Sequence, residues 1–312
     1  MKHRGIKYPE PLKKGDKIAL ISPASAVKKE YVDGATERLK ERGYEPVLMP
    51  HALDHVDGSF ASSRKERLSD LLQAIENPEF KAIFCTRGGY GCCQLLMDLS
   101  PEFISRHPKW IIGFSDISAL HALWYHSGVA SIHGPMAKHL ATMPEDDPCT
   151  LALFDILENG CRFDYTVSPH ANNRHGFAKG VLRGGNLAVL NDLSATPYDI
   201  LDIKTDEDVI LFLEDISEPI YKVNRMLWRL LNSDSLQRVK GIIFGRFTEY
   251  KPDANFSSME DMIHHFVKAS IPDDIPIVYK FPTGHTDINF PLVEGAEVDL
   301  EADDLRVRLR TV

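Results

Sequence analysis

Residues 111–120 have the sequence IIGFSDISAL, in which a run of apolar residues ends at Gly113 and a helical pattern begins almost at once. The two isoleucines before the glycine are typical of a buried strand, whereas Ile117, Leu120 and Trp124 recur at the spacing of one helical face. A strand that leads directly into a helix is the repeating unit of an α/β fold, in which parallel strands alternate with helices.

The same alternation continues on both sides of this stretch. A helix around Ala35 and Leu39 is expected to end near Gly43, and Ser63 with Glu66 forms a capping box that begins another helix. Short apolar runs predict five strands, at residues 18–21, 47–49, 82–85, 110–112 and 130–133. The first half of the chain therefore predicts a parallel sheet between helices, which is a three-layer domain.

The second half of the chain predicts a smaller α/β domain. Its patterns predict strands at 209–213, 241–244 and 277–279, helices at 220–231 and 259–269, and a terminal β-hairpin at 296–300 and 305–309. Residues 141–180 contain several prolines and show weaker periodicity, apart from one short helix at 151–157. We therefore expect an N-terminal domain over residues 1–165, a linker over 166–180 and a C-terminal domain over 181–312.

The composition argues against some classes of binding partner and indicates a cellular compartment. The chain has 312 residues, 43% of them hydrophobic, and a net charge of -9 with lysines and arginines interleaved among acids. We therefore expect neither nucleic acid nor an anionic membrane as a partner. No apolar segment follows the basic residues within 1–9, and the five cysteines show no metal or redox spacing. Both features favour a cytoplasmic protein with free thiols.

Ser115 follows a predicted strand and precedes a predicted helix, where its hydroxyl can be exposed. The unpaired N–H groups of the new helix, especially that of Asp116, could stabilise an oxyanion there. A second interpretation is that Ser115 or Asp116 only caps the helix. The usual hydrolase turn has a glycine two residues after the serine, and here that position is Ile117.

A glycine-rich loop follows another predicted strand and precedes a helical run. Residues 86–91 have the sequence TRGGYG, in which Gly88 and Gly89 let the backbone come close to a ligand. The loop could cradle a phosphate, supply an oxyanion N–H beside Ser115, or be a structural turn. It matches neither the dinucleotide fingerprint nor the Walker loop, which favours the oxyanion interpretation over nucleotide binding.

A serine nucleophile needs a base, and the base needs a partner that fixes its tautomer. His285 lies just beyond a predicted strand, and Glu214 directly follows another. The carboxyl ends of parallel strands are where open α/β sheets build their sites. The chain has thirteen histidines, however, and His133 also closes a strand. Spacing alone does not choose between these two histidines.

Several motifs together resemble the LD-carboxypeptidase family of serine peptidases, which includes the microcin C immunity hydrolases. The resemblance covers nearly the whole chain. The motifs occur in order as LKKGDKIA (12–19), SPAS (22–25), RGGYG (87–91), GFSD (113–116), HGP (133–135), GGNL (184–187), LEDISE (213–218), RML (225–227) and GH (284–285).

The resemblance implies a role for each matching residue. Ser115 would be the nucleophile, His285 the general base, and Glu214 the carboxylate that holds His285, with Glu218 as the alternative glutamate. The amides of Asp116 and of Gly88 or Gly89 would form the oxyanion hole. No metal and no other cofactor would be required.

The resemblance also implies the reaction and its setting. Family members cleave the bond between an L-centre and a terminal D-amino acid, releasing D-alanine from muropeptide tetrapeptides during murein recycling. A homodimer and a site in the cleft between the two domains are expected on the same basis. Because a carboxypeptidase must bind a terminal carboxylate, Arg87, Arg183 and Arg246 are candidates for that contact.

Three other functions remain open at this point. The same chemistry could act on an aminoacyl-nucleotide amide, as in the microcin immunity hydrolases, although no extra loop can be assigned to a nucleotide. The chain could instead be a muropeptide-binding protein that has lost catalysis, against which all three triad residues are present. An esterase of the ordinary α/β-hydrolase type is disfavoured by Ile117 and by the two-domain pattern.

Overall fold

The computed structural model describes residues 5–54, 59–203, 207–232 and 236–312. The basic residues 1–4, which bear on the expected lack of a signal peptide, lie outside these ranges. The chain forms two compact units. The first unit holds the residues up to Arg162 together with Phe290–Glu294, and the second unit holds Phe163–Asn289 with Gly295–Val312.

The first unit is built on a six-stranded sheet with the order β11-β5-β4-β3-β1-β2. Its strands are β1 (Lys17–Ile21), β2 (Glu45–Leu48), β3 (Phe80–Cys85), β4 (Trp110–Gly113), β5 (Ser131–His133) and β11 (Leu292–Glu294). The first five are parallel, as predicted, whereas β11 runs antiparallel to β5. Strand β2 lies on one side of β1, whereas β3, β4 and β5 follow on the other side, so the order of the strands changes direction between β1 and β3. Open α/β sheets place their ligand sites at such a point.

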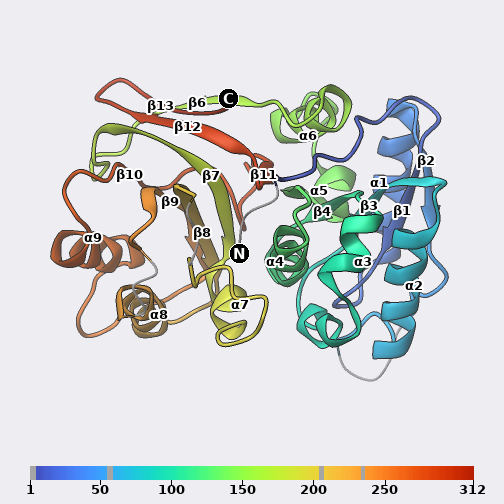
Figure 1. Cartoon of the computed structure of the whole chain (residues 1–312), viewed down its shortest axis with the longest axis horizontal. Coiled ribbons are helices and arrows are strands. Elements are labelled where there is room, and N and C mark those ends of the chain that lie inside the picture. Colours follow the sequence, from blue (N-terminus) through green and yellow to red (C-terminus); the bar gives the residue numbers. More distant parts are fainter. Residues whose placement is uncertain (1–4, 55–58, 204–206, 233–235) are drawn as a thin grey trace. The chain divides into compact units, whose positions relative to one another are not determined.

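Helices cover both faces of this sheet (Figure 1). On one face α1 (Lys29–Arg42) packs against α5 (Ala137–Thr142), and α6 (Pro148–Asn159) follows α5 along the chain. The other face carries α2 (Arg64–Glu76), α3 (Pro101–Arg106) and α4 (Ser118–His126). The helical run expected after the glycine loop is different in the structure. It consists of two short 3₁₀ turns, η1 (Cys92–Gln94) and η2 (Leu96–Asp98).

The second unit is built on a seven-stranded sheet with the order β10-β9-β8-β7-β12-β13-β6. Its strands are β6 (Asp164–Val167), β7 (Gly176–Asn186), β8 (Val209–Ile216), β9 (Val239–Thr248), β10 (Ile277–Val278), β12 (Glu297–Ala302) and β13 (Val307–Thr311). The neighbours from β7 to β10 pair in parallel, and β12 and β13 form the predicted terminal hairpin. The predicted α/β class with two sheets is confirmed.

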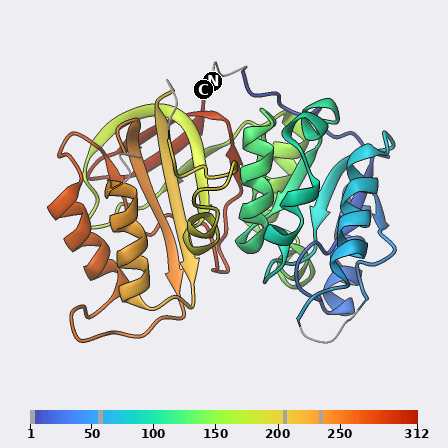
Figure 2. The same ribbon diagram turned by 60° about the horizontal axis from the view of Figure 1, so that its bottom comes forward.

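Three helices complete the second unit: α7 (Leu187–Asp192), α8 (Ile220–Asn232) and α9 (Met259–Ser270). Helices α8 and α9 lie next to one another along the sheet (Figure 2). Each of these two helices has a row of buried apolar residues on one face, as its helical periodicity predicts.

Residues 166–180, predicted as a linker, contain the end of β6 and the beginning of β7. The β7 sequence GFAKGVLRGGN has four glycines, which weaken any strand signal.

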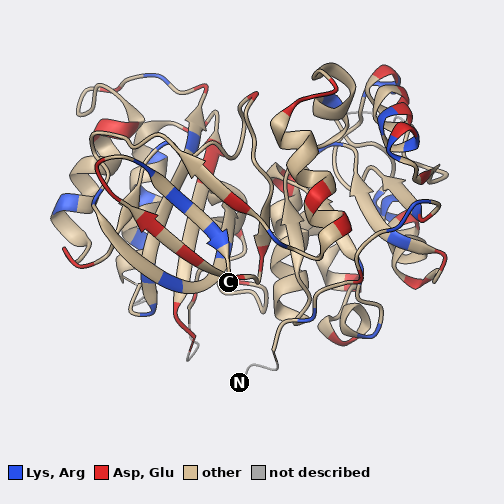
Figure 3. Ribbon diagram, turned by 90° about the horizontal axis from the view of Figure 1, so that it is seen from above, with Lys and Arg blue, Asp and Glu red and all other residues tan. Residues whose placement is uncertain are grey.

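Acidic and basic residues are interleaved over the ribbon of each unit (Figure 3). Strand β13 shows the pattern locally, where Arg308 pairs with Asp164 and Arg310 pairs with Asp299 on the neighbouring strands. Among the described residues, no helix combines the length and the apolar character that crossing a membrane requires.

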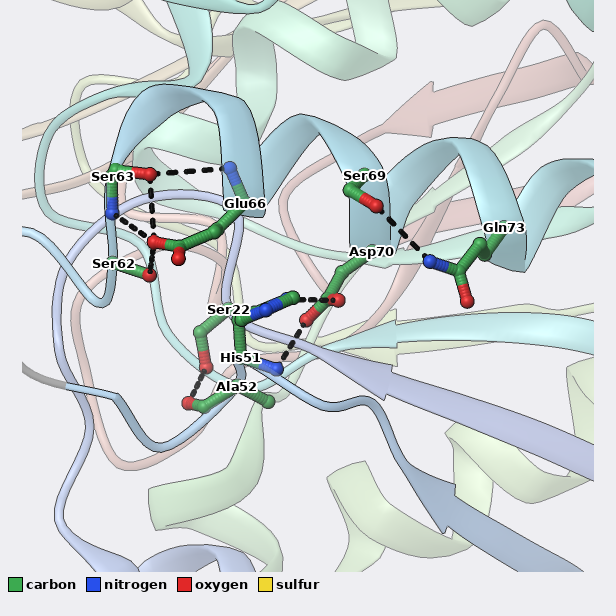
Figure 4. A network of polar contacts seen from close by, with 9 residues as sticks. All are labelled: Ser22, His51, Ala52, Ser62, Ser63, Glu66, Ser69, Asp70 and Gln73. Carbon is green, nitrogen blue, oxygen red and sulfur yellow. Dashed lines mark hydrogen bonds and ion pairs between the residues drawn. The ribbon is translucent and has the colours of Figure 1, made fainter.

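Polar contacts fix the loops that follow β1 and β2 against helix α2 (Figure 4). The carboxylate of Asp70 on α2 accepts a hydrogen bond from the backbone N–H of His51 at 2.9 Å. Its second oxygen lies 2.8 Å from Nδ1 of the His51 ring. Ser22, just after β1, donates to the carbonyl of Ala52 at 2.6 Å. The same hydroxyl lies 2.6 Å from that of Thr86, which follows β3. The loops at the carboxyl ends of these three strands are therefore held together.

The predicted capping box at the start of α2 is present. The Ser63 hydroxyl accepts from the N–H of Glu66 at 3.3 Å, and the Glu66 carboxylate accepts from the N–H of Ser63 at 3.2 Å. Hydrogen bonds from Ser62 and Ser63 lower the pKa of Glu66 to about 2, so the carboxylate stays ionised at neutral pH. This box fixes where α2 begins.

We predict that Ser63→Ala lowers the free energy of unfolding by about 1 kcal/mol, because the helix loses its N-cap acceptor. Urea denaturation followed by circular dichroism measures the change. Ser69→Ala is the matched control on the same helix, where the hydroxyl accepts a hydrogen bond from the Gln73 side chain at 3.0 Å. That control should change the free energy of unfolding by less than about 0.5 kcal/mol. Equal effects of the two substitutions would contradict the capping role.

Candidate active site

Ser115 occupies a strained turn between β4 and α4. It begins the 3₁₀ turn η3 (Ser115–Ile117), and its φ of 66° lies in the left-handed region that a side chain rarely adopts. Such strain persists only where the surrounding structure holds it, and it is concentrated at functional sites. The serine is half-buried, whereas the strand before it and the helix after it are buried. The predicted position between a strand and a helix is confirmed.

The glycine loop lies directly against this turn. A Cβ added to Gly88 would come within 2.9 Å of the Ser115 Cβ and 3.2 Å of the Asp116 backbone nitrogen. Any side chain at residue 88 would therefore displace the serine or its neighbouring amide. The sequence predicted that this loop could lie beside Ser115, and the structure brings the two together. The backbone of Gly88 thus lies close to the Ser115 side chain and to the backbone nitrogen of Asp116.

The neighbouring Ser25, in the loop after β1, orients the glycine loop. Its N–H donates to the carbonyl of Gly88 at 3.1 Å, and its hydroxyl accepts from the N–H of Tyr90 at 3.1 Å. Gly89 has a φ of 104°, and a Cβ there would collide with the Ser25 hydroxyl at 2.3 Å. Because the Gly88 carbonyl is engaged by Ser25, the direction of the following peptide is fixed.

The Asp116 side chain points away from solvent and is 4% exposed. Its Oδ2 accepts from the backbone N–H of Cys92 at 2.8 Å, which joins the Ser115 turn to the segment that follows the glycine loop. Burial raises the pKa of Asp116, although the hydrogen bond from Cys92 acts against that rise. The side chain of Asp116 thus has a structural role.

Arg67 is a residue that sequence analysis missed. Its side chain is 2% exposed, although it lies on a helix whose pattern predicts a solvated arginine. The guanidinium donates to the carbonyls of Ser62 at 3.1 Å, Pro23 at 2.6 Å and Gly91 at 3.1 Å, and to the Gln94 side chain at 2.6 Å. One buried cation therefore connects the loop after β1, the start of α2 and the end of the glycine loop.

Glu214 and His285 meet in the second unit. The His285 Nδ1 lies 2.7 Å from Oε2 of Glu214, and the glutamate is fully buried while 16% of the histidine side chain is exposed. Glu214 lies within β8, opposite Asn186 of β7, rather than just beyond the strand as predicted. A hydrogen bond from Nδ1 to a buried carboxylate fixes the tautomer in which Nε2 can accept a proton.

The backbone directly before this histidine requires a glycine, which is Gly284. Its φ is 103°, and a Cβ there would lie 2.6 Å from the same Glu214 oxygen that pairs with His285. The N–H of Gly284 donates to the Asn289 side chain at 2.9 Å, which holds the loop in place. The glycine thus lets the histidine loop approach the carboxylate closely enough to form the pair.

Two opposing effects set the pKa of His285. Burial lowers it, whereas the hydrogen bond and charge of Glu214, with smaller contributions from Asp215 and Glu249, raise it above its usual value. The carboxylates prevail, so the imidazolium is stabilised at this position. Burial, with repulsion from Glu214, also raises the pKa of Asp215 to about 7. This environment suits a histidine that must hold a proton briefly during a reaction.

The alternative histidine, His133, and the alternative glutamate, Glu218, have different surroundings. His133 is fully buried in the first unit, where its ring packs against Phe114 and near His121, whose pKa burial lowers to about 4. Glu218, the alternative glutamate, forms an ion pair with Lys222 at 3.2 Å. These surroundings differ from those of the buried Glu214–His285 pair.

The three candidate arginines differ in exposure and in hydrogen-bond partners. Arg87 is exposed and donates to the carbonyl of Ala26. Arg183 is 3% exposed and donates to the carbonyl of Ile200 at 3.2 Å. Arg246 is half-buried near the end of β9, and its backbone N–H donates to Thr283, two residues before His285, at 3.0 Å. Arg246 is thus bonded through its backbone to the loop that carries His285.

Comparison with known proteins places both halves of the chain in one family. Residues 18–134 match the LD-carboxypeptidase N-terminal domain, and residues 179–300 match the LD-carboxypeptidase C-terminal domain. The murein tetrapeptide carboxypeptidase of Pseudomonas aeruginosa is 31% identical over 301 residues, which cover 93% of this chain and 94% of that protein.

Two solved structures are similar over nearly their whole length. The muramoyltetrapeptide carboxypeptidase of Oxalobacter formigenes is 29% identical with a TM-score of 0.82, covering 95% of this chain and 98% of that one. An MccF-like protein of Bacillus anthracis is 26% identical with a TM-score of 0.83, covering 97% and 98%. The chain therefore belongs to the LD-carboxypeptidase family and is a carboxypeptidase hydrolase of the serine type.

Proposed function

We propose that this protein removes the terminal D-alanine from a muropeptide tetrapeptide, L-Ala-γ-D-Glu-meso-diaminopimelate-D-Ala, with Ser115 as nucleophile. The observation that carries the proposal is the strained Ser115 turn with the glycine loop packed against it. The buried Glu214–His285 pair supplies the second part of a serine hydrolase. The similarity to the murein tetrapeptide carboxypeptidase supports the choice of substrate.

The proposed reaction has two steps. His285 accepts the Ser115 proton at Nε2 as the serine oxygen attacks the carbonyl carbon of the diaminopimelate–D-alanine amide. His285 then gives this proton to the D-alanine nitrogen, and the C–N bond breaks to leave an acyl-enzyme. Water, deprotonated by His285, hydrolyses the ester and restores the serine. Glu214 keeps Nδ1 protonated throughout and stabilises the imidazolium.

The N–H groups of Asp116 and of Gly88 or Gly89 would hold the oxyanion of each tetrahedral intermediate. The closeness of residue 88 to the Asp116 nitrogen supports this assignment. Among the arginines, we propose Arg246 for the terminal carboxylate of the substrate. Its Nε is buried and has no hydrogen-bond partner within the part of the chain that the structure describes. A carboxylate is the usual partner of such a guanidinium.

We also propose that the protein acts in the cytoplasm as a homodimer. The five cysteines, which show no metal or redox spacing, support the compartment, and the family resemblance supports the dimer. Light scattering during size-exclusion chromatography measures the mass directly, and a value near 35 kDa would reject the dimer.

A second substrate class follows from the likeness to the MccF-like structure. The same machinery could cleave the amide of an aminoacyl-nucleotide analogue. Cleavage of such an analogue by wild type and by Ser115→Ala is therefore measured alongside D-alanine release. Cleavage of only the nucleotide amide would keep the catalytic assignment and replace the muropeptide.

We predict that Ser115→Ala lowers kcat/KM for D-alanine release by at least about 10⁴-fold, because the acyl-enzyme cannot form. Release is measured by chromatography of the tripeptide product. Ser69 lies on α2, where its hydroxyl accepts a hydrogen bond from Gln73. Ser69→Ala is the matched control and should leave the rate unchanged. Near-normal activity of Ser115→Ala would reject the serine mechanism.

We predict that Gly88→Ala lowers kcat by about 10²-fold or more, because the new methyl group displaces an oxyanion donor from Ser115. Gly5→Ala is the control, since a Cβ there meets no atom within 4 Å. Thermal melting checks that both variants fold. A folded Gly88→Ala enzyme with normal kcat would show that this loop takes no part in the reaction.

The pH dependence follows from the sign of the His285 shift. The base must be neutral, so kcat/KM should fall as the pH drops through the pKa of His285, which the carboxylates hold above its usual value of 6.5. Glu214→Gln removes the largest of these charges. We therefore predict that the acid limb moves to lower pH, together with a large loss of kcat.

NMR titration of the His285 ring measures the same pKa without turnover. Glu249→Gln is the control, because Glu249 contributes least of the three carboxylates and should move the pKa less. An unchanged pKa of His285 in Glu214→Gln would contradict the pairing.

A further inference from the structure

Three buried side chains with metal-binding atoms gather in the first unit, on residues to which the proposed reaction gives no role. His121 of α4, His133 of β5 and Glu294 of β11 each offer one ligand atom, and these atoms all lie within 4.8 Å of one another. The exposed fractions of the three residues are 0%, 0% and 1%. Clusters of exposed acids are common in proteins, but a buried set of two imidazoles and a carboxylate is not.

The strand register explains why these residues share a face. Leu292 of β11 pairs with His133 of β5, and Glu294 pairs with Ser131. Directly opposed residues, and residues two apart on one strand, point to the same side of a sheet. His133, Ser131 and Glu294 therefore lie on one face, and α4 packs against β5 there with His121.

Two polar atoms at this position lack hydrogen-bond partners. They are Nδ1 of His121 and the hydroxyl of Ser131, both buried and both without a partner anywhere in the described ranges. Leaving a buried polar atom without a hydrogen bond destabilises the folded state, so a bound species is one of its ordinary explanations. The Nε2 of His121 lies 2.8 Å from the carbonyl of Gly113 and donates to it. This bond fixes the tautomer and leaves a lone pair on Nδ1.

We propose that His121, His133 and Glu294 form a structural binding site for a zinc ion or a similar divalent transition metal. A ligating histidine whose other nitrogen donates to a backbone carbonyl is the usual arrangement at such centres, and His121 has it. Two imidazoles and a carboxylate are a known zinc ligand set. The Ser131 hydroxyl, opposite Glu294, is placed to act as a fourth ligand or to support one.

A divalent cation bound at this position would balance the charge of the Glu294 carboxylate while both imidazoles stay neutral. Zinc bonds of about 2.0–2.2 Å place tetrahedral ligand atoms about 3.4 Å apart. Binding would thus draw the three side chains together by up to about 1.4 Å, which rotation of the histidine and glutamate side chains can supply.

The metal would join two segments that matter for the reaction. Strand β11 has only three residues and is an edge strand held by β5, and six residues separate it from His285. His121 in turn holds the carbonyl of Gly113, two residues before Ser115. A cation here would fasten β11 to β5 and α4 and would stiffen the start of the Ser115 turn. This role is independent of the substrate.

The test is the metal content of the intact protein. Because the cluster is buried, the full chain is unfolded in denaturant with a chelator, refolded with or without zinc chloride, and dialysed. Mass spectrometry of the metal is expected to give one zinc per chain, and the zinc-refolded protein should melt at a higher temperature than the metal-free one. Refolding with Co²⁺ should give the visible absorption of a tetrahedral site.

Variants separate this site from adventitious binding. Glu294→Gln and His121→Gln should lose the retained zinc and the Co²⁺ absorption, whereas His126→Gln, an exposed histidine on the same helix, should keep both. Failure of wild-type protein to retain zinc would overturn the proposal, and it would do so even if both variants failed to fold. Equal retention by wild type, Glu294→Gln and His121→Gln would overturn it as well. Loss of zinc with unchanged D-alanine release would leave the catalytic assignment intact.

Discussion

The left-handed backbone of Ser115 is the constraint on which the first unit depends. A non-glycine residue in this conformation costs about 1–3 kcal/mol, so its neighbours must hold it. The glycine loop packs within van der Waals contact, and the Asp116 carboxylate is bonded to the N–H of Cys92. The buried guanidinium of Arg67 donates hydrogen bonds to four groups and holds together the loop after β1, the start of α2 and the end of the glycine loop. The strain is thus distributed over contacts that also hold the glycine loop against the serine.

The second unit keeps the Glu214 carboxylate and the His285 ring paired in a largely buried position. Burial acts against the charged forms of both residues, so the pair depends on a short and well-aligned hydrogen bond. Gly284 allows the close approach, and the nearby carboxylates raise the pKa of His285 despite its burial. The same environment raises the pKa of Asp215 to about 7, which limits the negative charge collected around Glu214. Electrostatics, rather than packing, therefore decides the chemistry here.

Several features were hidden from the sequence for identifiable reasons. Strand β7 carries four glycines, and its pairing with β8 and β12 supplies the order that its composition does not predict. Strand β11 has three residues and gains its place only by pairing with β5, far away in the sequence. Arg67 lies at a helical position where an arginine is usually solvated, and only the three loops around it explain its burial. Glu214 lies within β8 because pairing continues beyond the apolar run.

The sequence by itself determined the α/β class, most strands of both sheets, the capped start of α2 and the position of Ser115 between a strand and a helix. These depend on local periodicity and on residues close together in the chain, which a sequence displays directly. Tertiary structure decided which carboxylate bonds to His285, which loop touches Ser115, and that His133 lies buried near His121 and Glu294. Each of these contacts joins residues far apart in the chain. Their geometry follows from strand order and register, which no local pattern encodes.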